Sequence, residues 1–214
     1  YLRGGDAAAF KEAMETIREN YPRPAFYSCM NMLGTHDNPR ILTLLGTFPK
    51  EAPHSMSIEN VRAYFAQFGR ADDILEFTTS SATVQLAAEA VGTIPARIAK
   101  TLSFQGADDT ALLIVCAGDV KIDNSKFKAA FGFKAKMLSP DLALAYTGHA
   151  VGGICPFALP ADGKVRVYTD VSMQRFETIF PAAGSSNSAI ELTCDDLYRY
   201  SGSLAWVDVC KPIE

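Results

Sequence analysis

The stretch TALLIVCAG, residues 110–118, decides the fold of this chain. Every residue from Ala111 to Ala117 is apolar, and Thr110 and Gly118 bound the run. A continuous apolar run of this length between turn residues is typical of a strand that is buried on both faces of a sheet. Other elements must then cover both faces. The stretch therefore predicts an α/β protein built around residues 110–118.

Outward from this strand, helix and strand patterns are mixed. Residues 95–106 begin as a helical turn and continue as a strand, and residues 81–92 predict a capped helix that Gly92 ends. Further helices are expected over residues 124–132, 139–148 and 193–202, the last capped by Thr193, and further strands over residues 134–139, 165–173, 178–184 and 204–210. We expect one mixed α/β domain over residues 56–214.

That domain is expected to begin with a helix at MSIENVRAYFAQFG, residues 56–69. Ser57 is the predicted N-cap of this helix. Its apolar side chains recur at the spacing of one helix face: Ile58, Val61, Tyr64, Phe65 and Phe68. The segment PKEAPHS, residues 49–55, has two prolines and no periodicity, so it predicts a junction before the domain.

Residues 1–55 have a different character. A helix is expected over residues 6–20, and NMLGTHDNPR follows at residues 31–40. Together with IRENYP, this stretch resembles part of the catalytic barrel of the α-amylase family, in which the positions of His36 and Asp37 bind the sugar. Such a barrel needs about 200 residues or more, and glycoside hydrolysis needs two further carboxyl roles from other strands. Residues 1–55 are therefore expected to be an appended fragment plus a linker, without glycosidase activity.

Composition sets limits on the class of protein. The chain has 214 residues, of which 48% are hydrophobic and 21% charged, and a formal net charge of −4. These values indicate a folded domain with no general attraction to nucleic acid, although a local basic patch remains compatible with RNA. No apolar run approaches the roughly 20 residues of a membrane span, and no secretory leader is evident, so the cytoplasm is the expected location.

The five cysteines are odd in number and scattered, without a CxxC pair, so we expect reduced thiols. Cys155 is the one worth considering as a nucleophile, but no base is evident near it in the sequence.

Several stretches in the domain carry a resemblance to a known family: RIAKTLSF, GDVKIDNSKF, KAKMLSP, TGHAVGGICPFALP, VYTDVSM and GSSNSAIELT. In these motifs and their order, residues 56–214 resemble the YbaK/EbsC family of aminoacyl-tRNA deacylases, which is related to the editing insertion of bacterial prolyl-tRNA synthetases. The resemblance implies an α/β fold with a curved, barrel-like mixed β-sheet flanked by helices. It also implies hydrolysis of the ester that joins a wrong amino acid to tRNA, notably in Cys-tRNA(Pro) or Ala-tRNA(Pro).

The partners that follow are the 3′ aminoacyl end of a mischarged tRNA and, as a further candidate, prolyl-tRNA synthetase. No cofactor or metal is expected, because an activated ester needs little more than a held carbonyl, a stabilised oxyanion and a placed water. For cysteinyl-tRNA, the substrate's own thiol is a candidate nucleophile.

The catalytic candidates are Lys100, His149, Gly152 and Gly153. Lys100 matches the family's functionally important lysine, which is thought to engage the 3′-terminal adenosine or its phosphate. Glycines 152 and 153 allow close approach of the backbone to a ligand and can direct N–H groups at the carbonyl oxygen. His149 is a candidate for orienting a water or the aminoacyl group, and a structural histidine near a helix end is the alternative.

The candidate substrate-binding residues lie on both sides of that loop in sequence. Pro156 stiffens the turn after the glycines. Ser185, Ser186 and Asn187 form a polar loop that either lines a pocket or is a turn with local hydrogen bonds. A small patch of Arg97, Lys100 and Lys121 is the expected tRNA contact.

Three aspartates, Asp119, Asp123 and Asp170, are interpreted as turn and cap residues and not as a metal site, because no His or Cys stands at ligand spacing. Two other functions remain open. One is a module that binds aminoacyl-tRNA or CCA ends without hydrolysis, and the remote one is a carbohydrate-active fragment.

Overall fold

The computed structural model describes residues 56–78, 81 and 83–213. The predictions for residues 1–55, including His36 and Asp37, lie outside this part of the chain. The predicted buried strand is strand β3, Ala111–Ala117, and all of its residues are buried. It pairs antiparallel with β2, Ile98–Gln105, and parallel with β5, Val165–Asp170. The apolar run thus lies at the centre of a sheet.

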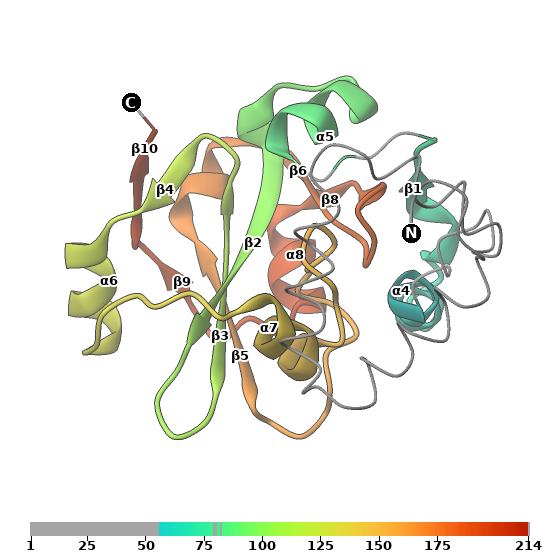
Figure 1. The fold of residues 1–214 in the computed structure, drawn as a ribbon. Helices are drawn as coiled ribbons and strands as arrows, with labels where there is room; N and C mark the ends of the chain where they lie inside the picture. The colour runs from blue at the N-terminus through green and yellow to red at the C-terminus, as the bar shows by residue number, and fades with distance from the viewer. Residues whose placement is uncertain (1–55, 79–80, 82, 214) are drawn as a thin grey trace, which may run out of the picture. The chain divides into compact units, whose positions relative to one another are not determined.

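This sheet has six strands in the order β8-β6-β2-β3-β5-β9 and is mixed in direction. The outer strands are β6 (Thr178–Pro181), β8 (Leu192–Thr193) and β9 (Trp206–Val207). Two small antiparallel pairs accompany it: β1 (Ile74–Glu76) with β7 (Ser188–Ile190), and β4 (Val120–Ile122) with β10 (Cys210–Pro212). The sheet curls into a half-barrel with helices around it (Figure 1), which confirms the expected fold class.

Five α-helices flank the sheet within the described residues: α4 (Met56–Ala66), α5 (Val84–Val91), α6 (Asn124–Phe131), α7 (Pro140–Thr147) and α8 (Cys194–Tyr200). Short 3-10 turns occur at η1 (Ala71–Asp73), η2 (Pro95–Arg97) and η3 (Val171–Arg175). The predicted caps are confirmed: Thr193 accepts from the N–H of Asp196, and Gly92 and Gly148 end α5 and α7 in the left-handed region. No helix in this part of the chain is long and apolar enough to span a membrane.

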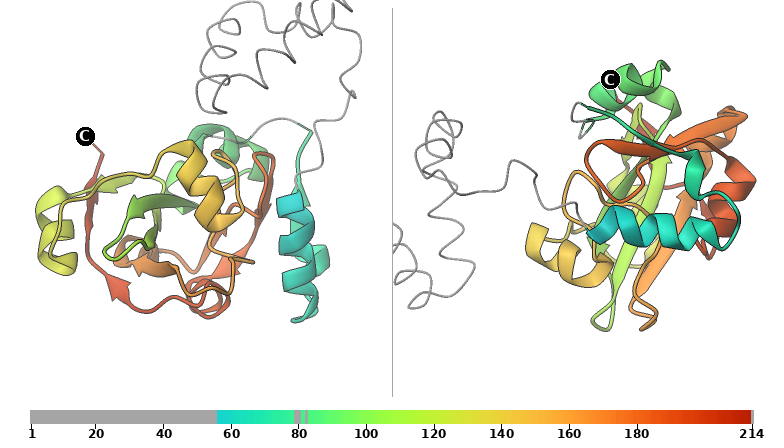
Figure 2. Two further views of the ribbon diagram at one scale, coloured as in Figure 1. Left: turned by 60° about the horizontal axis from the view of Figure 1, so that its bottom comes forward. Right: turned by 90° about the vertical axis from the view of Figure 1, so that its right-hand side faces the viewer.

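Helix α4 lies at one end of the domain, and α6, β4 and β10 lie together at the other (Figures 1 and 2). The predicted apolar face of α4 is buried through Ile58, Val61 and Phe65. The ring centroid of Phe65 is 4.9 Å from that of Phe157 and 5.4 Å from that of Tyr200. Burial of these side chains stabilises the fold by about 2 kcal/mol each.

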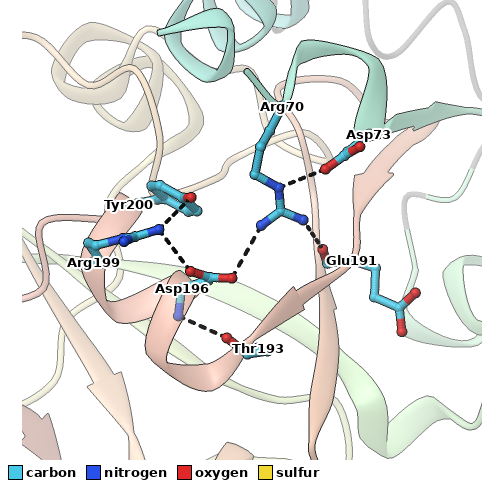
Figure 3. A network of polar contacts seen from close by, with 7 residues as sticks. All are labelled: Arg70, Asp73, Glu191, Thr193, Asp196, Arg199 and Tyr200. Atoms are coloured by element: carbon cyan, nitrogen blue, oxygen red, sulfur yellow. Dashed lines mark hydrogen bonds and ion pairs between the residues drawn. The ribbon is translucent and has the colours of Figure 1, made fainter. Parts of the chain in front are cut away.

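A polar network fastens the chain after α4 to α8 (Figure 3). The guanidinium of Arg70 pairs with Asp73 at 2.6 Å and Asp196 at 3.3 Å, and it donates to the backbone oxygen of Glu191 at 3.2 Å. Asp196 also pairs with Arg199 at 3.0 Å. The network therefore joins η1, β8 and α8.

Four expectations about elements are wrong. Residues 134–139 form no strand, because only Met137 bridges to Phe104 before Ser139 caps α7. The strand expected over residues 165–173 ends at Asp170, whose side chain caps η3. Ser57 lies inside the first turn of α4 instead of capping it, and its hydroxyl hydrogen-bonds to Nδ1 of His149. The expected last strand is divided between β9 and β10, and strands β1, β4, β7 and β8 were not predicted.

Candidate active site

Lys100 is the third residue of β2, and its half-buried side chain is held by the turn between β3 and β4. Its Nζ donates to the backbone oxygen of Gly118 at 3.2 Å and to that of Val120. Neither acceptor is charged. The carboxylate of Asp119, between them in the chain, is engaged by the guanidinium of Arg175 at 2.6 and 3.0 Å. The ammonium of Lys100 is therefore positioned without being neutralised by an ion pair within the described residues.

The turn that holds Lys100 depends on a glycine that the sequence analysis did not single out. A Cβ on Gly118 would lie 2.0 Å from the backbone oxygen of Pro95 and 2.5 Å from Cγ1 of Val84. Only glycine fits between this turn and the residues before β2. The position of Gly118 directly after the buried strand was the available signal.

The glycine loop, residues 148–157, follows α7 and packs against the polar loop. A Cβ on Gly153 would lie 2.8 Å from backbone atoms of Ser185, so the two loops touch along their backbones. The N–H of Gly153 donates to the backbone oxygen of Ala150 at 3.0 Å. Gly152 has a φ of +96°, and within the described residues its N–H has no acceptor. Of the two expected donors, Gly152 is thus the one available to a ligand.

The polar loop, residues 184–188, is a turn closed by its own side chains. The hydroxyl of Ser185 donates to Oδ1 of Asn187 at 2.9 Å and to the hydroxyl of Ser188 at 2.8 Å. The amide of Asn187 donates to the backbone oxygen of Phe77 at 2.8 Å. Ser186 is exposed, and its backbone oxygen accepts from the N–H of Ser81 at 2.6 Å. These contacts confirm the alternative of a turn with local hydrogen bonds. The backbone of this turn lies against Gly153.

Strand register relates these parts to Lys100. Strands β2 and β6 run parallel, with Ala99 opposite Pro181. Lys100 is the next residue of β2, and Ser185 follows Pro181 by four residues, a chain length of at most about 14 Å. Because Gly153 touches Ser185, the polar loop and the glycine loop lie within that chain length of the strand pair that carries Lys100.

His149 is buried, with 1% of its surface exposed, and both ring nitrogens have partners. Nδ1 hydrogen-bonds to the hydroxyl of Ser57, and Nε2 lies 2.8 Å from the backbone oxygen of Phe157. Burial lowers the pKa of His149 below its ordinary value of 6.5. These contacts favour the structural alternative, in which His149 joins α4 to the glycine loop. Ser57 was missed as its partner because it is 92 residues away in sequence.

The buried histidine predicts a pH dependence of stability. Its pKa in the folded state lies below 6.5, so the unfolded chain binds the proton more readily. The stability from this group is complete above about pH 6.5 and is lost as pH falls through the folded pKa, by at most about 1.4 kcal/mol per pH unit. Urea unfolding between pH 5.5 and 7.5 measures this slope. His149→Gln is expected to flatten it, and equal slopes for both proteins would contradict the assignment.

Cys155 lies beside this histidine, with Sγ 3.5 Å from Nε2. Nε2 nevertheless has to donate to the backbone oxygen of Phe157, so it cannot accept the thiol proton. Burial also raises the pKa of the Cys155 thiol to about 12, so it is protonated at neutral pH. Cys155 and its neighbour Pro156 are both buried, so they form part of the packed side of the glycine loop.

Comparison with known proteins identifies the family. Residues 78–200 match the family described as "Aminoacyl-tRNA editing domain". The chain belongs to this family. An uncharacterized protein of Bacillus subtilis (strain 168), YwhH, is 56% identical over 159 residues, which cover 74% of this chain and all of that protein. The match to the editing-domain family confirms the expected resemblance of the domain to aminoacyl-tRNA editing proteins.

Two further likenesses concern the fold and a short segment. The crystal structure of a candidate trans-editing enzyme for prolyl-tRNA synthetase superposes with a TM-score of 0.65 at 23% identity, over 76% of this chain and 99% of that one. An amylopullulanase of Thermoanaerobacterium thermosulfurigenes is 56% identical over 41 residues, which are 19% of this chain and 2% of that protein. The first agrees in fold, and the second bears out the resemblance of a short segment to the α-amylase family.

In this editing domain, the guanidinium of Arg97 is held by contacts within the protein. The guanidinium donates to the backbone oxygen of Thr178 at 3.0 Å and pairs with Glu191 at 3.1 Å. It also lies 5.0 Å from the ring centroid of Phe180. These contacts fasten η2 to β6. Arg97 therefore has a structural role, and its predicted substrate-binding role stays a prediction.

The three aspartates have the turn and cap roles expected of them. Asp123 caps α6 by accepting from the N–H groups of Ser125 and Lys126, and Asp170 accepts from those of Ser172 and Val209. Asp119 stands in the turn beside Lys100, and the guanidinium of Arg175 lowers the pKa of its carboxyl.

Proposed function

We propose that this chain is an aminoacyl-tRNA deacylase that hydrolyses the ester of mischarged tRNA, most specifically Cys-tRNA(Pro) or Ala-tRNA(Pro). The observation that carries the proposal is the ammonium of Lys100, which is fixed by two backbone carbonyls and forms no ion pair within the described residues. A fixed cation beside a backbone-lined loop is suited to a phosphate or a developing oxyanion. Membership of the editing-domain family supports this assignment.

The proposed chemistry assigns few roles. Lys100 binds the 3′-terminal adenosine through its phosphate, which places the ester beside the glycine loop. The N–H of Gly152 donates to the carbonyl oxygen as a nucleophile adds to the carbonyl carbon. The acyl C–O bond then breaks, the ribose oxygen leaves with the bonding electron pair and takes a proton from solvent, and the nucleophile loses its own proton to solvent. The nucleophile is water or, for cysteinyl-tRNA, the substrate's own thiol.

The choice of tRNA(Pro) is supported by the resemblance of the motifs and by the fold shared with the candidate prolyl-tRNA synthetase trans-editing enzyme. Prolyl-tRNA synthetase is, on the same grounds, a candidate partner. The test compares amino acid release from Cys-tRNA(Pro), Ala-tRNA(Pro) and correctly charged Pro-tRNA(Pro) by the full chain. We expect release from one or both mischarged species and much slower release from the third. Equal rates for all three would contradict an editing function, and binding of intact tRNA without release would favour the non-hydrolytic module.

We also propose that the deacylase domain is residues 56–214 and that residues 1–55 are an appended fragment. The full-length alignment of the Bacillus subtilis protein to 74% of this chain supports a complete domain of that size. A chain of residues 56–214 is expected to deacylate within about twofold of the full chain, since every described contact of Lys100 and the glycine loop lies inside it. A parallel rate measurement on both chains checks this, and loss of activity in the shorter one would contradict the boundary.

A further inference from the structure

The chain carries a net charge of −4, yet its basic side chains are unevenly placed. The segment of residues 120–138, from β4 through α6 to the start of α7, contains five lysines and one carboxylate, Asp123. That carboxylate caps α6 by accepting from two backbone N–H groups. We define the lysine surface as these five lysines and the one opposite them on β10: Lys121, Lys126, Lys128, Lys134, Lys136 and Lys211.

Most of the lysine surface is not neutralised by the protein. Lys126 pairs with Asp208 at 2.7 Å, and Lys211 pairs with Asp123 at 3.6 Å. The other four lysines are exposed, and their side chains have no ion pair or hydrogen bond within the described residues. By contrast, five of the six arginines in the described residues form ion pairs, those at positions 62, 70, 97, 175 and 199, and the exposed Arg166 forms none there. Most of the exposed basic side chains without an ion pair are thus concentrated at one end of the domain, and Arg166 on β5 is the exception within the described residues.

Strand pairing places two of these charges directly against each other. In the β4–β10 ladder, Lys121 stands opposite Lys211. Like charges at opposed positions of an antiparallel pair destabilise it. Asp123, which pairs with Lys211, also caps α6. An anion bound across this pair would remove the repulsion.

The lysine surface is continuous with the proposed active site. Lys100 donates to the backbone oxygen of Val120, the residue before Lys121. From there, β4 and β10 lead to α6 at the same end of the domain (Figure 1). A nucleic acid whose 3′ end reaches Lys100 can therefore place its adjoining phosphates over Lys121 and the α6 lysines.

We propose that the lysine surface binds the phosphodiester backbone of the tRNA acceptor stem while its 3′ end occupies the site at Lys100. This inference rests on the proposed deacylase function. Lysine ammonium groups act as point charges toward phosphates and give affinity without sequence specificity. The acidic remainder of the chain disfavours RNA elsewhere and so orients the stem along β4 and α6.

The test measures the affinity of the full chain for uncharged tRNA(Pro) by fluorescence anisotropy over a range of KCl concentrations. The double variant Lys121→Gln, Lys128→Gln is compared with the control Lys164→Gln, Arg199→Gln, which removes the same charge from other elements. We expect the first variant to weaken binding by about tenfold or more and to reduce the slope of log K against log salt by about 1.5. The control is expected to stay within about threefold of wild type. Equal weakening in both variants, or none in the first, would overturn the proposal that the lysine surface binds the acceptor stem.

A second measurement separates this inference from the proposed function. The substrate is a short 3′-aminoacylated CCA oligonucleotide that lacks the stem. Wild type and the Lys121→Gln, Lys128→Gln variant are expected to hydrolyse it at equal rates, while the variant is slower on full-length mischarged tRNA below saturation. If wild type hydrolyses neither substrate, the deacylase proposal fails, and the anisotropy result still decides whether the lysine surface binds RNA. A variant impaired equally on both substrates would contradict a role confined to the stem.

Discussion

Lys100→Ala is expected to lower the single-turnover rate of amino acid release from mischarged tRNA(Pro) by roughly 100-fold or more. The reason is that the ammonium of Lys100 is held at the β3–β4 turn by two backbone oxygens, while the nearby carboxylate of Asp119 is engaged by Arg175. Removing it deletes the charge that fixes the 3′ end. The measurement is quenched-flow or manual release of labelled amino acid with enzyme in excess.

Two controls make this result specific to the site. Lys164→Ala removes an exposed lysine whose ion pair with Asp109 spans 3.6 Å, and its rate is expected to stay within about twofold of wild type. Thermal unfolding of Lys100→Ala should show a folded protein, because the lost hydrogen bonds are at a half-buried side chain. A folded Lys100→Ala protein with the wild-type rate would remove Lys100 from the mechanism.

Gly153→Ala is expected to give the second large effect. The added Cβ would lie 2.8 Å from backbone atoms of Ser185, and two backbones cannot yield as a flexible side chain would. The loops must separate, at a cost of about 1 to 3 kcal/mol in the free energy of unfolding. A displacement of about 1 Å at the site is enough for a loss of roughly 100-fold in the rate of release.

The matched control for this substitution is Gly163→Ala. Gly163 has a φ of +73° and nothing within 4 Å of an added Cβ, so the change introduces backbone strain without a steric clash. It is expected to cost about 1 kcal/mol of stability and to leave the rate of release unchanged. If both variants lose stability equally and keep full activity, the contact between the glycine loop and the polar loop has no part in catalysis.

Local patterns in the sequence predicted those elements whose formation depends mainly on neighbouring residues. The apolar run at residues 110–118 predicted β3, and Thr193 and Gly148 were recognised as helix ends because capping depends on neighbouring residues. The strand expected at residues 134–139 is wrong because this segment makes only one bridge to β2, between Met137 and Phe104, before Ser139 caps α7. The pairing of β1 with β7, more than a hundred residues apart, has no local signal.

The same distinction applies to the candidate site. Lys100 and the glycine loop were identified through motifs, and the structure places the glycine loop against the polar loop that follows β6, the parallel neighbour of β2. The burial of His149 and its bond to Ser57 depend on how α4 packs, which no local pattern reveals. Arg97 has no evident partner in the sequence. Its partners in the structure, Thr178 of β6 and Glu191, lie much further along the chain.

The most direct test of the account is the release of cysteine and alanine from Cys-tRNA(Pro) and Ala-tRNA(Pro) by the full chain, measured against spontaneous hydrolysis in buffer. We predict release well above the spontaneous rate for at least one of the two, with free tRNA and free amino acid as products. A chain that binds tRNA(Pro) but leaves both esters at the spontaneous rate would contradict the deacylase assignment.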